Sequence, residues 1–338
     1  MNHNLLEVKN LKTYFFTRNG VVQAVDGVNL ALRKGENLCL VGESGCGKTA
    51  TALSILRLID SPPGKILGGE ILFHDEDLLR CPEERLRQIR GREIAMIFQD
   101  PQSSLNPVFT VGDQIAEPLK LHLKLNSKEA LERARELMEQ VGIPQADERM
   151  KDYPHQFSGG MKQRVMIAAA LSCDPEILIA DEPTTALDTT IKAQILDIFH
   201  DLKQARNMSI LFITHDMGTV AGIADRIVVM YGGKIAEVGT TFDIFDQPAH
   251  PYTQGLLTCL PNISAQQQRL TPIPGTIPSL IDPPSGCIFH PRCPKRMPIC
   301  DQEDPPEVFI SDEHRVVCQL YKQPVTSPGK TGDTHSAQ

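Results

Sequence analysis

The sequence lacks the features that mark several common classes of protein. Its longest apolar stretches, VMIAAALSC at 165–173 and ILIA at 177–180, fall far short of the roughly 18 residues that a membrane span needs. Positive charge is not in excess, because the net charge is −8, so a broad surface for nucleic acid or anionic lipid is disfavoured. The first residues, MNHNLLEVKN, lack the charged and apolar regions of a signal peptide. We therefore expect a soluble, cytosolic chain without a nucleic-acid partner.

The composition of the 338-residue chain changes near residue 240. Fifteen of the 25 prolines lie beyond that point, and regular hydrophobic periodicity fades there. We expect a large domain over 5–240 and a smaller unit over 241–320. The tail at 321–338 is polar and has no core residues, so we expect it to be disordered.

Four apolar runs have the character of buried strands: ENLCLV (36–41), EIAMIF (93–98), EILIAD (176–181) and SILFITHD (209–216). Their continuous apolarity is typical of parallel strands that are buried on both faces. Helical periodicity at 51–59, 129–142, 160–172 and 191–204 gives the strand and helix alternation of an α/β fold. Two further pairs of segments, LLEVKNLKTYFF with VVQAVDGVNLALRKG and RIVVMY with KIAEVG, predict hairpins. We therefore predict a helix-covered parallel sheet with an antiparallel edge.

A glycine-rich loop, GESGCGKT at 42–49, lies between the first buried strand and the helix that follows it. Its form, G-x-x-x-x-G-K-[ST], is typical of loops whose backbone N–H groups wrap a polyphosphate. Lys48 would reach the phosphates, and the hydroxyl of Thr49 would hold Mg²⁺. A glycine turn that merely opens a helix is the alternative, which the strand before the loop and the helix after it disfavour. The expected nucleotide contacts are Gly42, Ser44, Gly45, Gly47, Lys48, Thr49 and Ala50.

A second motif, ILIADE at 177–182, ends an apolar strand with two carboxylates. Asp181 can hold the Mg²⁺ shell, and Glu182 can position and polarise the attacking water in phosphoryl transfer. A solvated turn is the alternative for a pair of acids at a strand end. Together with the phosphate loop, the pair predicts hydrolysis of ATP or GTP.

The segment FSGGMKQR at 157–164 distinguishes among enzymes with a phosphate loop. Ser158 can cap the helix that begins at the two glycines, which leaves N–H groups and a positive dipole end for an anion. From this segment alone, capping without further function is an equal alternative. Its place nineteen residues before ILIADE resembles the signature of ABC ATPases.

With these motifs, residues 5–240 resemble the nucleotide-binding domain of ABC transporters. The resemblance implies a P-loop NTPase fold with an antiparallel β subdomain and a helical subdomain over about 100–173. The signature departs from the commoner LSGGQ at Phe157 and Met161, but its serine and both glycines remain. Six motifs occur in the family's order: GESGCGKT as Walker A, FQD with Gln99 as Q-loop, FSGGM as signature, ILIADE as Walker B, ALD with Asp188 as D-loop, and THD with His215 as switch.

The resemblance also implies how these residues act. Two nucleotide domains face head to tail in this family, so the signature and D-loop of one chain serve the nucleotide of the other. Glu182 would be the catalytic base, with Lys48, Gln99 and His215 assisting it. Phe15 is favoured over Tyr14 for stacking on adenine. The remaining implied roles are Thr49, Gln99 and Asp181 as Mg²⁺ ligands, and Ser158, Gly159, Gly160 and Asp188 as contacts of the partner's nucleotide.

Beyond residue 240, HPYTQGLL at 250–257, a proline-rich stretch and a group of cysteines resemble the C-terminal extension of ATPase subunits of dipeptide, oligopeptide and nickel importers. The resemblance then covers about residues 5–320. It implies an ATPase at the cytoplasmic face of the inner membrane, bound peripherally. Its partners would be a homologous ATPase subunit in a heterodimer, two permease subunits and, indirectly, an extracytoplasmic substrate-binding protein.

Two points about function are left open by the sequence. The transported solute cannot be read from this chain, so peptides, nickel and other small solutes remain candidates. The alternative function is that of a soluble ABC ATPase in translation or DNA repair. In that case the C-terminal cysteines would form a metal-cluster regulatory module. A single Walker A motif and the lack of sustained heptads in the sequence disfavour it.

Four of the nine cysteines, Cys287, Cys293, Cys300 and Cys318, are clustered near the C-terminus. Persistent disulfides are not expected in a reducing cytosol, which leaves free thiols or a metal. Three prolines and few large apolar side chains in this stretch favour a metal, because a small unit without a core needs a staple. The spacings C-x5-C, C-x6-C and C-x17-C match neither usual zinc sites nor common ferredoxins, so they do not choose the metal. The resemblance favours a [4Fe–4S] cluster over Zn²⁺.

Overall fold

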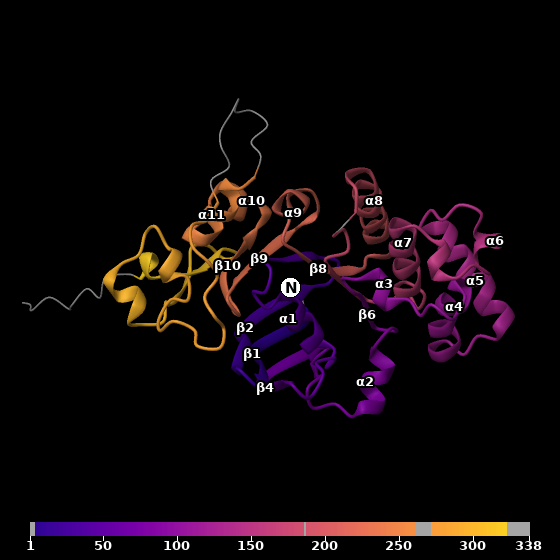
Figure 1. Ribbon diagram of the computed structural model, residues 1–338, viewed down its shortest axis with the longest axis horizontal. Helices are drawn as coiled ribbons and strands as arrows, with labels where there is room; N and C mark the ends of the chain where they lie inside the picture. The colour runs from indigo at the N-terminus through magenta and orange to yellow at the C-terminus, as the bar shows by residue number, and fades with distance from the viewer. Residues whose placement is uncertain (1–3, 186, 261–271, 323–338) are drawn as a thin grey trace, which may run out of the picture.

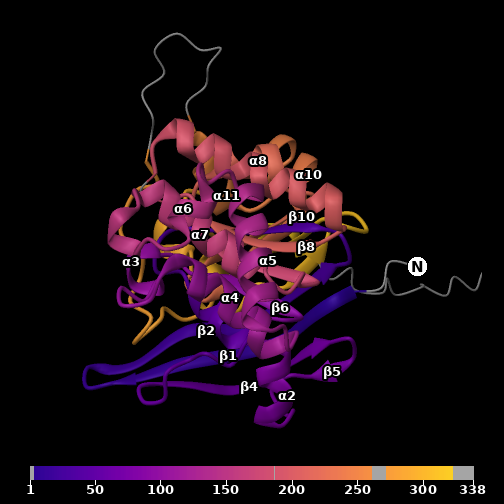
Figure 2. The ribbon, with the colours of Figure 1, turned by 90° about the vertical axis from the view of Figure 1, so that its right-hand side faces the viewer.

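The computed structural model describes residues 4–185, 187–260 and 272–322 and contains two β-sheets with helices around them (Figure 1). Of the tail that we predicted to be disordered, residues 323–338 lie outside the described residues. Figures 1 and 2 both place the smaller sheet on one side of the molecule and helices α8 and α10 on the opposite side.

The larger sheet has eight strands in the order β11-β12-β10-β9-β3-β8-β7-β6. The strands from β9 to β6 in this order pair in parallel, which confirms the prediction from the apolar runs. Every residue of β3, β7 and β8 is buried, which explains why these segments are apolar without alternation. The bounds are β3 (Asn37–Val41), β6 (Ile94–Ile97), β7 (Ile177–Asp181), β8 (Ser209–Thr214), β9 (Arg226–Tyr231) and β10 (Lys234–Thr240).

The smaller sheet is antiparallel, in the order β2-β1-β4-β5. Its strands are β1 (Asn4–Thr17), β2 (Gly20–Arg33), β4 (Gly64–Phe73) and β5 (Glu76–Asp77). The predicted hairpin of β1 and β2 is confirmed, but it forms a separate sheet and not an edge of the parallel one. The reason is burial, because Leu6 and Leu11 of β1 share an apolar cluster with Leu38 and Leu40 of β3. The hairpin of β9 and β10 instead extends the parallel sheet.

Helices α3 to α7 gather at one end of the molecule, on the right of Figure 1. The predicted helices at 129–142, 160–172 and 191–204 are confirmed to within a few residues. The helix expected at 51–59 begins earlier and ends at Ile55, because Arg57 adopts a left-handed φ of 51°. The bounds are α1 (Lys48–Ile55), α2 (Glu83–Ile89), α3 (Pro101–Ser104), α4 (Val111–His122), α5 (Ser127–Gln140), α6 (Ala146–Arg149), α7 (Gly159–Ala170), α8 (Thr189–Arg206), α9 (Met217–Ile223), α10 (Thr241–Asp246) and α11 (Pro251–Thr258).

The chain beyond residue 240 continues the larger sheet, at the end of the molecule opposite the helical region (Figure 1). Strand β12 (Arg315–Val317) pairs antiparallel with β10, and β11 (Glu307–Phe309) pairs with β12. Cys287 and Phe289 belong to the same apolar cluster as Ile227 and Val229 of β9. The C-terminal segment therefore shares its core with the rest of the protein, and the domain boundary near residue 240 stays a prediction.

A buried carboxylate fastens this segment to the sheet. Glu237 of β10 accepts hydrogen bonds from the backbone N–H groups of Ala249 at 2.7 Å and His250 at 2.9 Å. Nε2 of His314 lies 2.7 Å from the same carboxylate. A buried charge is costly unless it is paired and hydrogen-bonded, so these contacts hold residues 249, 250 and 314 in place around β10.

We predict that His250 makes folding sensitive to acid. Burial lowers the pKa of this histidine to about 4, whereas an unfolded histidine titrates near pH 6.5. Between these two pKa values, His250 is therefore mostly neutral in the folded state and mostly protonated in the unfolded state. This contribution to stability is fully present above about pH 6.5 and is lost as the pH falls towards 4. At about pH 5 the free energy of unfolding should have dropped by about 2 kcal/mol on this account.

The substitution His250→Asn tests this prediction, because the ring of His250 caps α11 and asparagine can cap a helix without titrating. The free energy of unfolding in urea should change less for this variant than for the wild type between about pH 7.5 and about pH 5. The exposed His155→Asn is the control and should follow the wild type. An unchanged pH dependence in His250→Asn would contradict the prediction.

Candidate functional site

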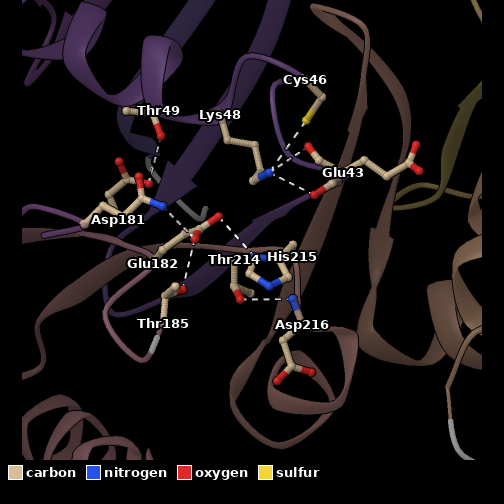
Figure 3. A network of polar contacts seen from close by, with 12 residues as sticks. Glu43, Cys46, Lys48, Thr49, Asp181, Glu182, Thr185, Thr214, His215 and Asp216 are labelled. Atoms are coloured by element: carbon tan, nitrogen blue, oxygen red, sulfur yellow. Dashed lines mark hydrogen bonds and ion pairs between the residues drawn. The ribbon is translucent and has the colours of Figure 1, made fainter. Parts of the chain in front are cut away.

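The glycine-rich loop at 42–49 connects β3 to α1 at the carboxyl edge of the parallel strands. Gly47 precedes α1 with a φ of 104°, and a Cβ there would stand 2.1 Å from the carbonyl oxygen of Ala24, so only glycine fits. Nζ of Lys48 donates hydrogen bonds to the carbonyl oxygens of Gly42 at 2.8 Å and Glu43 at 3.0 Å. The loop is thus folded around the ammonium group that it carries (Figure 3).

The other predicted nucleotide contacts lie in the same loop and on β1. Ser44 and Gly45 are exposed at the tip of the loop, and Ala50 packs against the apolar cluster under α1. On β1, the hydroxyl of Tyr14 donates to Asp26 at 3.0 Å. Burial and this carboxylate together raise the pKa of Tyr14 to about 12. Phe15 is half-buried beside Gly64, and the choice of Phe15 over Tyr14 as the adenine contact stays a prediction.

Two of the predicted Mg²⁺ ligands, from different elements, meet at the sheet edge. Asp181 is the last residue of β7 and accepts a hydrogen bond from Oγ1 of Thr49 at 3.2 Å (Figure 3). Burial raises the pKa of Asp181 to about 6, although the hydrogen bond from Thr49 opposes this. A divalent cation bound between the hydroxyl and the carboxylate would favour the ionised form. The third predicted ligand, Gln99, contacts Glu182 instead.

Glu182 stands at the centre of a polar network formed by three strand ends (Figure 3). Its carboxylate accepts hydrogen bonds from Nε2 of Gln99 after β6 and from Oγ1 of Thr185, both at 2.9 Å. Nδ1 of His215, directly after β8, lies 3.1 Å from the same carboxylate. Burial raises the pKa of Glu182, but the contacts with His215 and Thr185 outweigh burial and lower it overall. The site therefore holds an ionised carboxylate close to Lys48 and Asp181.

The signature residues belong to a different part of the chain. Oγ of Ser158 accepts a hydrogen bond from the N–H of Met161 at 3.4 Å, which confirms the predicted cap of α7. Gly159 is exposed, and a Cβ at Gly160 would stand 2.7 Å from the side chain of Ile191 in α8. Asp188 caps α8 through a 2.9 Å bond from the N–H of Ile191. Helix α7 lies in the helical region, apart from α1 (Figure 1), so the chain's own signature is not beside its phosphate loop.

The four clustered cysteines all carry free thiols. Burial raises the pKa of Cys287 to about 11, and the other three cysteines add to the rise, so the four sulfurs are close enough to interact electrostatically. Within the described part of the chain, however, no three His, Cys, Asp or Glu side chains meet as a group that could hold a metal ion. The prediction of a four-cysteine metal site is therefore not supported here.

Two sets of contacts to the site were not anticipated from the sequence. The hydrogen bond from Thr185 to Glu182 is local. The sequence carries a signal for it, because a hydroxyl three residues after a carboxylate can bind it within a turn. The second set is distant. Arg292 forms a bidentate ion pair with Glu43, and the hydroxyl of Tyr252 accepts the N–H of Glu43 at 2.9 Å. Residues 43 and 292 are separated by 249 positions, and no sequence pattern connects them.

The site combines a phosphate loop, an acidic pair after β7 and a histidine after β8. The fold around it combines a parallel sheet, a helical region and an antiparallel sheet. Together these features define an ATP-binding cassette ATPase. The sequence matches the ABC transporter family over residues 25–185. It also matches the family of the oligopeptide/dipeptide transporter C-terminal region over residues 236–300.

Individual proteins agree with these family matches. The chain is 51% identical over 329 residues to the dipeptide transport ATP-binding protein DppD of Bacillus subtilis (strain 168), covering 97% of this chain and 98% of that protein. It is 52% identical over 313 residues to the oligopeptide transport ATP-binding protein OppD of the same organism, covering 92% and 87%. The solved dimeric structure of MJ0796, a bacterial ABC transporter cassette, is similar with a TM-score of 0.63 and 27% identity, over 70% of this chain and 98% of that one.

This chain therefore belongs to the ABC transporter family of ATPases, in the group that carries the oligopeptide/dipeptide transporter C-terminal region. The predicted cassette fold is confirmed. The alternative of a soluble ABC ATPase without a transport role finds no support among these relatives. None of the helices in the described ranges has both the length and the apolar character of a membrane span.

Proposed function

We propose that this chain hydrolyses ATP to power a peptide importer. The observation that carries the proposal is the convergence of Lys48, Asp181, Glu182 and His215 at one edge of the parallel sheet. The relatives DppD and OppD are named as dipeptide and oligopeptide transport proteins, so peptides are the proposed solute. Nickel or another small solute is the alternative solute.

In the proposed complex, backbone N–H groups of residues 42–50 bind the phosphates of ATP, and Phe15 stacks on adenine. Lys48 exchanges its bonds to the carbonyl oxygens of Gly42 and Glu43 for bonds to phosphate oxygens. Thr49, Asp181 and Gln99 would hold Mg²⁺, which would neutralise charge on the phosphates. Gln99 would hold the metal through Oε1, whereas its Nε2 donates to Glu182, so one side chain can contact both.

Glu182 is the proposed base. Its lowered pKa keeps the carboxylate ionised, so it can accept a proton from the water that attacks the γ-phosphorus while the bond to the bridging oxygen of ADP breaks. Its three side-chain contacts leave one of the roughly four acceptor positions of the carboxylate for the water. We propose that His215 then stabilises charge on the transferred phosphoryl group.

We further propose that Ser158, Gly159, Gly160 and Asp188 act on the nucleotide of a homologous ATPase subunit. Their separation from α1 supports this, because a chain cannot bring its own signature to its own phosphate loop. The dimeric state of MJ0796 supports pairing of two cassettes. The preference for a heterodimer rests on the resemblance stated above.

The proposed permease contact lies on the helical region. The exposed apolar side chains of Val108, Phe109 and Leu121 lie just before α4 and near its end. A groove there is lined by polar and charged side chains as well as apolar ones, namely Phe109, Asp113, Gln114, Glu117, Lys120, Leu121 and Lys124. A helix of a permease subunit could bury these side chains. On this proposal the chain lies at the cytoplasmic face of the inner membrane, with two permease subunits and, indirectly, a substrate-binding protein. Residues 5–240 form the nucleotide-binding domain, and 241–320 form the extension.

The four-cysteine prediction stays a proposal of finer detail. The backbone N–H groups of Phe289, Lys295 and Leu320 face the sulfurs of Cys287, Cys293 and Cys318 and lower their pKa, although burial raises it more. Such N–H contacts favour thiolates, which are the form that binds metals. Cys287, Cys293, Cys300 and Cys318 would hold the metal, and the resemblance to importer ATPases is the ground for favouring [4Fe–4S] over Zn²⁺.

The substitution Glu182→Gln tests the proposed base, because it keeps the shape and removes the charge. We expect ATP binding to remain and hydrolysis to fall by about 100-fold or more. The exposed Glu148→Gln in α6 is the matched control and should keep wild-type turnover. Both rates are measured as phosphate release at saturating ATP. Wild-type turnover in Glu182→Gln would refute the assignment.

Partnership is tested by the oligomeric state of the purified chain. Alone it should be mostly monomeric and slow, because each ATP needs a signature from a second cassette. Light scattering with ATP should show dimers of Glu182→Gln only when the sister ATPase is present. Full activity and stable ATP-dependent dimers from this chain alone would show self-pairing and refute the heterodimer.

The metal proposal is tested by purification without oxygen, followed by measurement of iron, acid-labile sulfide and the visible spectrum. We expect a coloured protein whose iron and sulfide are lost in Cys300→Ser and retained in Cys259→Ser. Nucleotide binding should be nearly unchanged in both variants. A colourless protein with stoichiometric zinc would rule out the cluster, and a protein without metal would leave four free thiols.

A further inference from the structure

The C-terminal segment contacts the phosphate loop through Tyr252 and through Arg292, and Arg292 binds a side chain of the loop. Nη1 and Nη2 of Arg292 donate to the two carboxylate oxygens of Glu43 at 2.7 and 3.1 Å. Glu43 is the second residue of the loop GESGCGKT, and Arg292 directly precedes Cys293. The pair therefore joins the loop that is proposed to hold ATP to the segment that carries the clustered cysteines.

Arg292 is fixed by contacts within its own segment and by β9. Nε donates to the carbonyl oxygen of Pro274 at 3.0 Å, and Nη2 donates to that of Ile273 at 3.3 Å. Nη1 also donates to the hydroxyl of Tyr231 at 3.3 Å. With the two bonds to Glu43, these contacts match the five N–H groups of a guanidinium with five acceptors. The side chain is only 4% exposed, so its position is set by the fold.

Glu43 is held at every polar group. Its N–H donates to the hydroxyl of Tyr252 in α11, and its carboxylate binds Arg292, so the chain beyond residue 240 fixes both. Its carbonyl oxygen accepts hydrogen bonds from Nζ of Lys48 at 3.0 Å and from the N–H of Cys46 at 3.3 Å. A continuous path of contacts thus runs from Arg292 through Glu43 to the ammonium group of Lys48.

The negative charge of Glu43 would weaken phosphate binding by the loop if Arg292 did not neutralise it. Figure 3 shows its carboxylate directed away from Lys48. If Arg292 were lost, the freed carboxylate could turn to Lys48 and compete with phosphate for the ammonium group. A negative charge on the loop would also repel the phosphates of ATP. Arg292 therefore both immobilises the loop and neutralises the one acidic side chain within GESGCGKT.

We propose that Arg292 is a positioning residue for ATP: through Glu43 it holds the phosphate loop in the conformation that receives phosphate, so that ATP affinity depends on the order of the C-terminal segment. This inference rests on the proposed role of the loop at 42–49 in ATP binding. It differs from a purely structural ion pair because it predicts that Arg292 acts on the nucleotide only through Glu43.

A double-mutant cycle on the full-length chain tests the inference, with the dissociation constant of a fluorescent ATP analogue as the readout. Arg292→Met keeps the side-chain length and should weaken binding by about tenfold, whereas in the background of Glu43→Gln the same change should cost less than about threefold. In the assembled ATPase, the KM for ATP of Arg292→Met should rise while kcat at saturating ATP stays near that of the wild type.

Arg296→Met is the matched control, because Arg296 lies in the same segment and pairs with Asp301 instead. It should bind the ATP analogue as the wild type does. An equal loss of affinity from Arg292→Met in both backgrounds would overturn the proposal, as would unchanged affinity in the folded variant. If Arg292→Met does not fold, Arg292→Lys takes its place, since a lysine keeps the charge but not the bidentate geometry. Unchanged affinity in that folded variant would likewise overturn the proposal.

ATP binding by the wild type distinguishes a failure of the proposed function from a failure of the inference about Arg292. If the wild-type chain does not bind the ATP analogue, the proposed function fails and the inference fails with it. If the wild type binds and the cycle shows no coupling between positions 43 and 292, the inference alone fails.

Discussion

Parallel pairing brings the carboxyl ends of β3, β6, β7 and β8 to one edge of the sheet, and each polar group of the proposed nucleotide site lies at or after one of these ends. The strands themselves are buried and apolar, so the first residues free to be polar are those at which they end. Asp181 ends β7, His215 follows β8, and Gln99 follows β6 by two residues. The register of the sheet therefore sets the positions of side chains that are far apart in sequence.

The polar groups at this edge satisfy one another in the described chain. Lys48 binds carbonyl oxygens of its own loop, Thr49 binds Asp181, and Glu182 accepts contacts from Gln99, Thr185 and His215. Buried polar groups without partners are costly, so such a network is expected before a ligand arrives. Binding of a nucleotide must exchange several of these contacts for new ones. The energy of binding therefore depends on how firmly the loop and its partners are held.

The segment beyond residue 240 packs on the rest of the protein and helps to hold the phosphate loop in place. Strand β12 extends the larger sheet, Phe289 packs on Tyr231 and Tyr252, and Glu237 is paired with His314. Arg292 reaches from this segment to Glu43 in the phosphate loop. A contact of this kind couples the packing of the C-terminal segment to the geometry of the loop, because neither partner has freedom to move alone.

Much of the protein follows from the sequence by itself. Continuous apolar runs predicted the parallel strands, Ser158 marked a helix start, and the motifs around Lys48, Asp181 and Glu182 indicated the proposed site, because these signals are local. Tertiary structure decided that the hairpin of β1 and β2 belongs to the antiparallel sheet that the resemblance implied, because apolar side chains of β1 and β3 pack in one cluster.

Tertiary structure also decided the contacts that cross between distant segments. Arg292 meets Glu43 across 249 positions, and the four cysteines approach one another without forming a group that could hold a metal ion within the described residues. Such contacts depend on how whole elements pack, and packing is set by the sum of many buried surfaces. No short pattern of residues encodes that sum, so the sequence could name the chemistry of these side chains but not their partners.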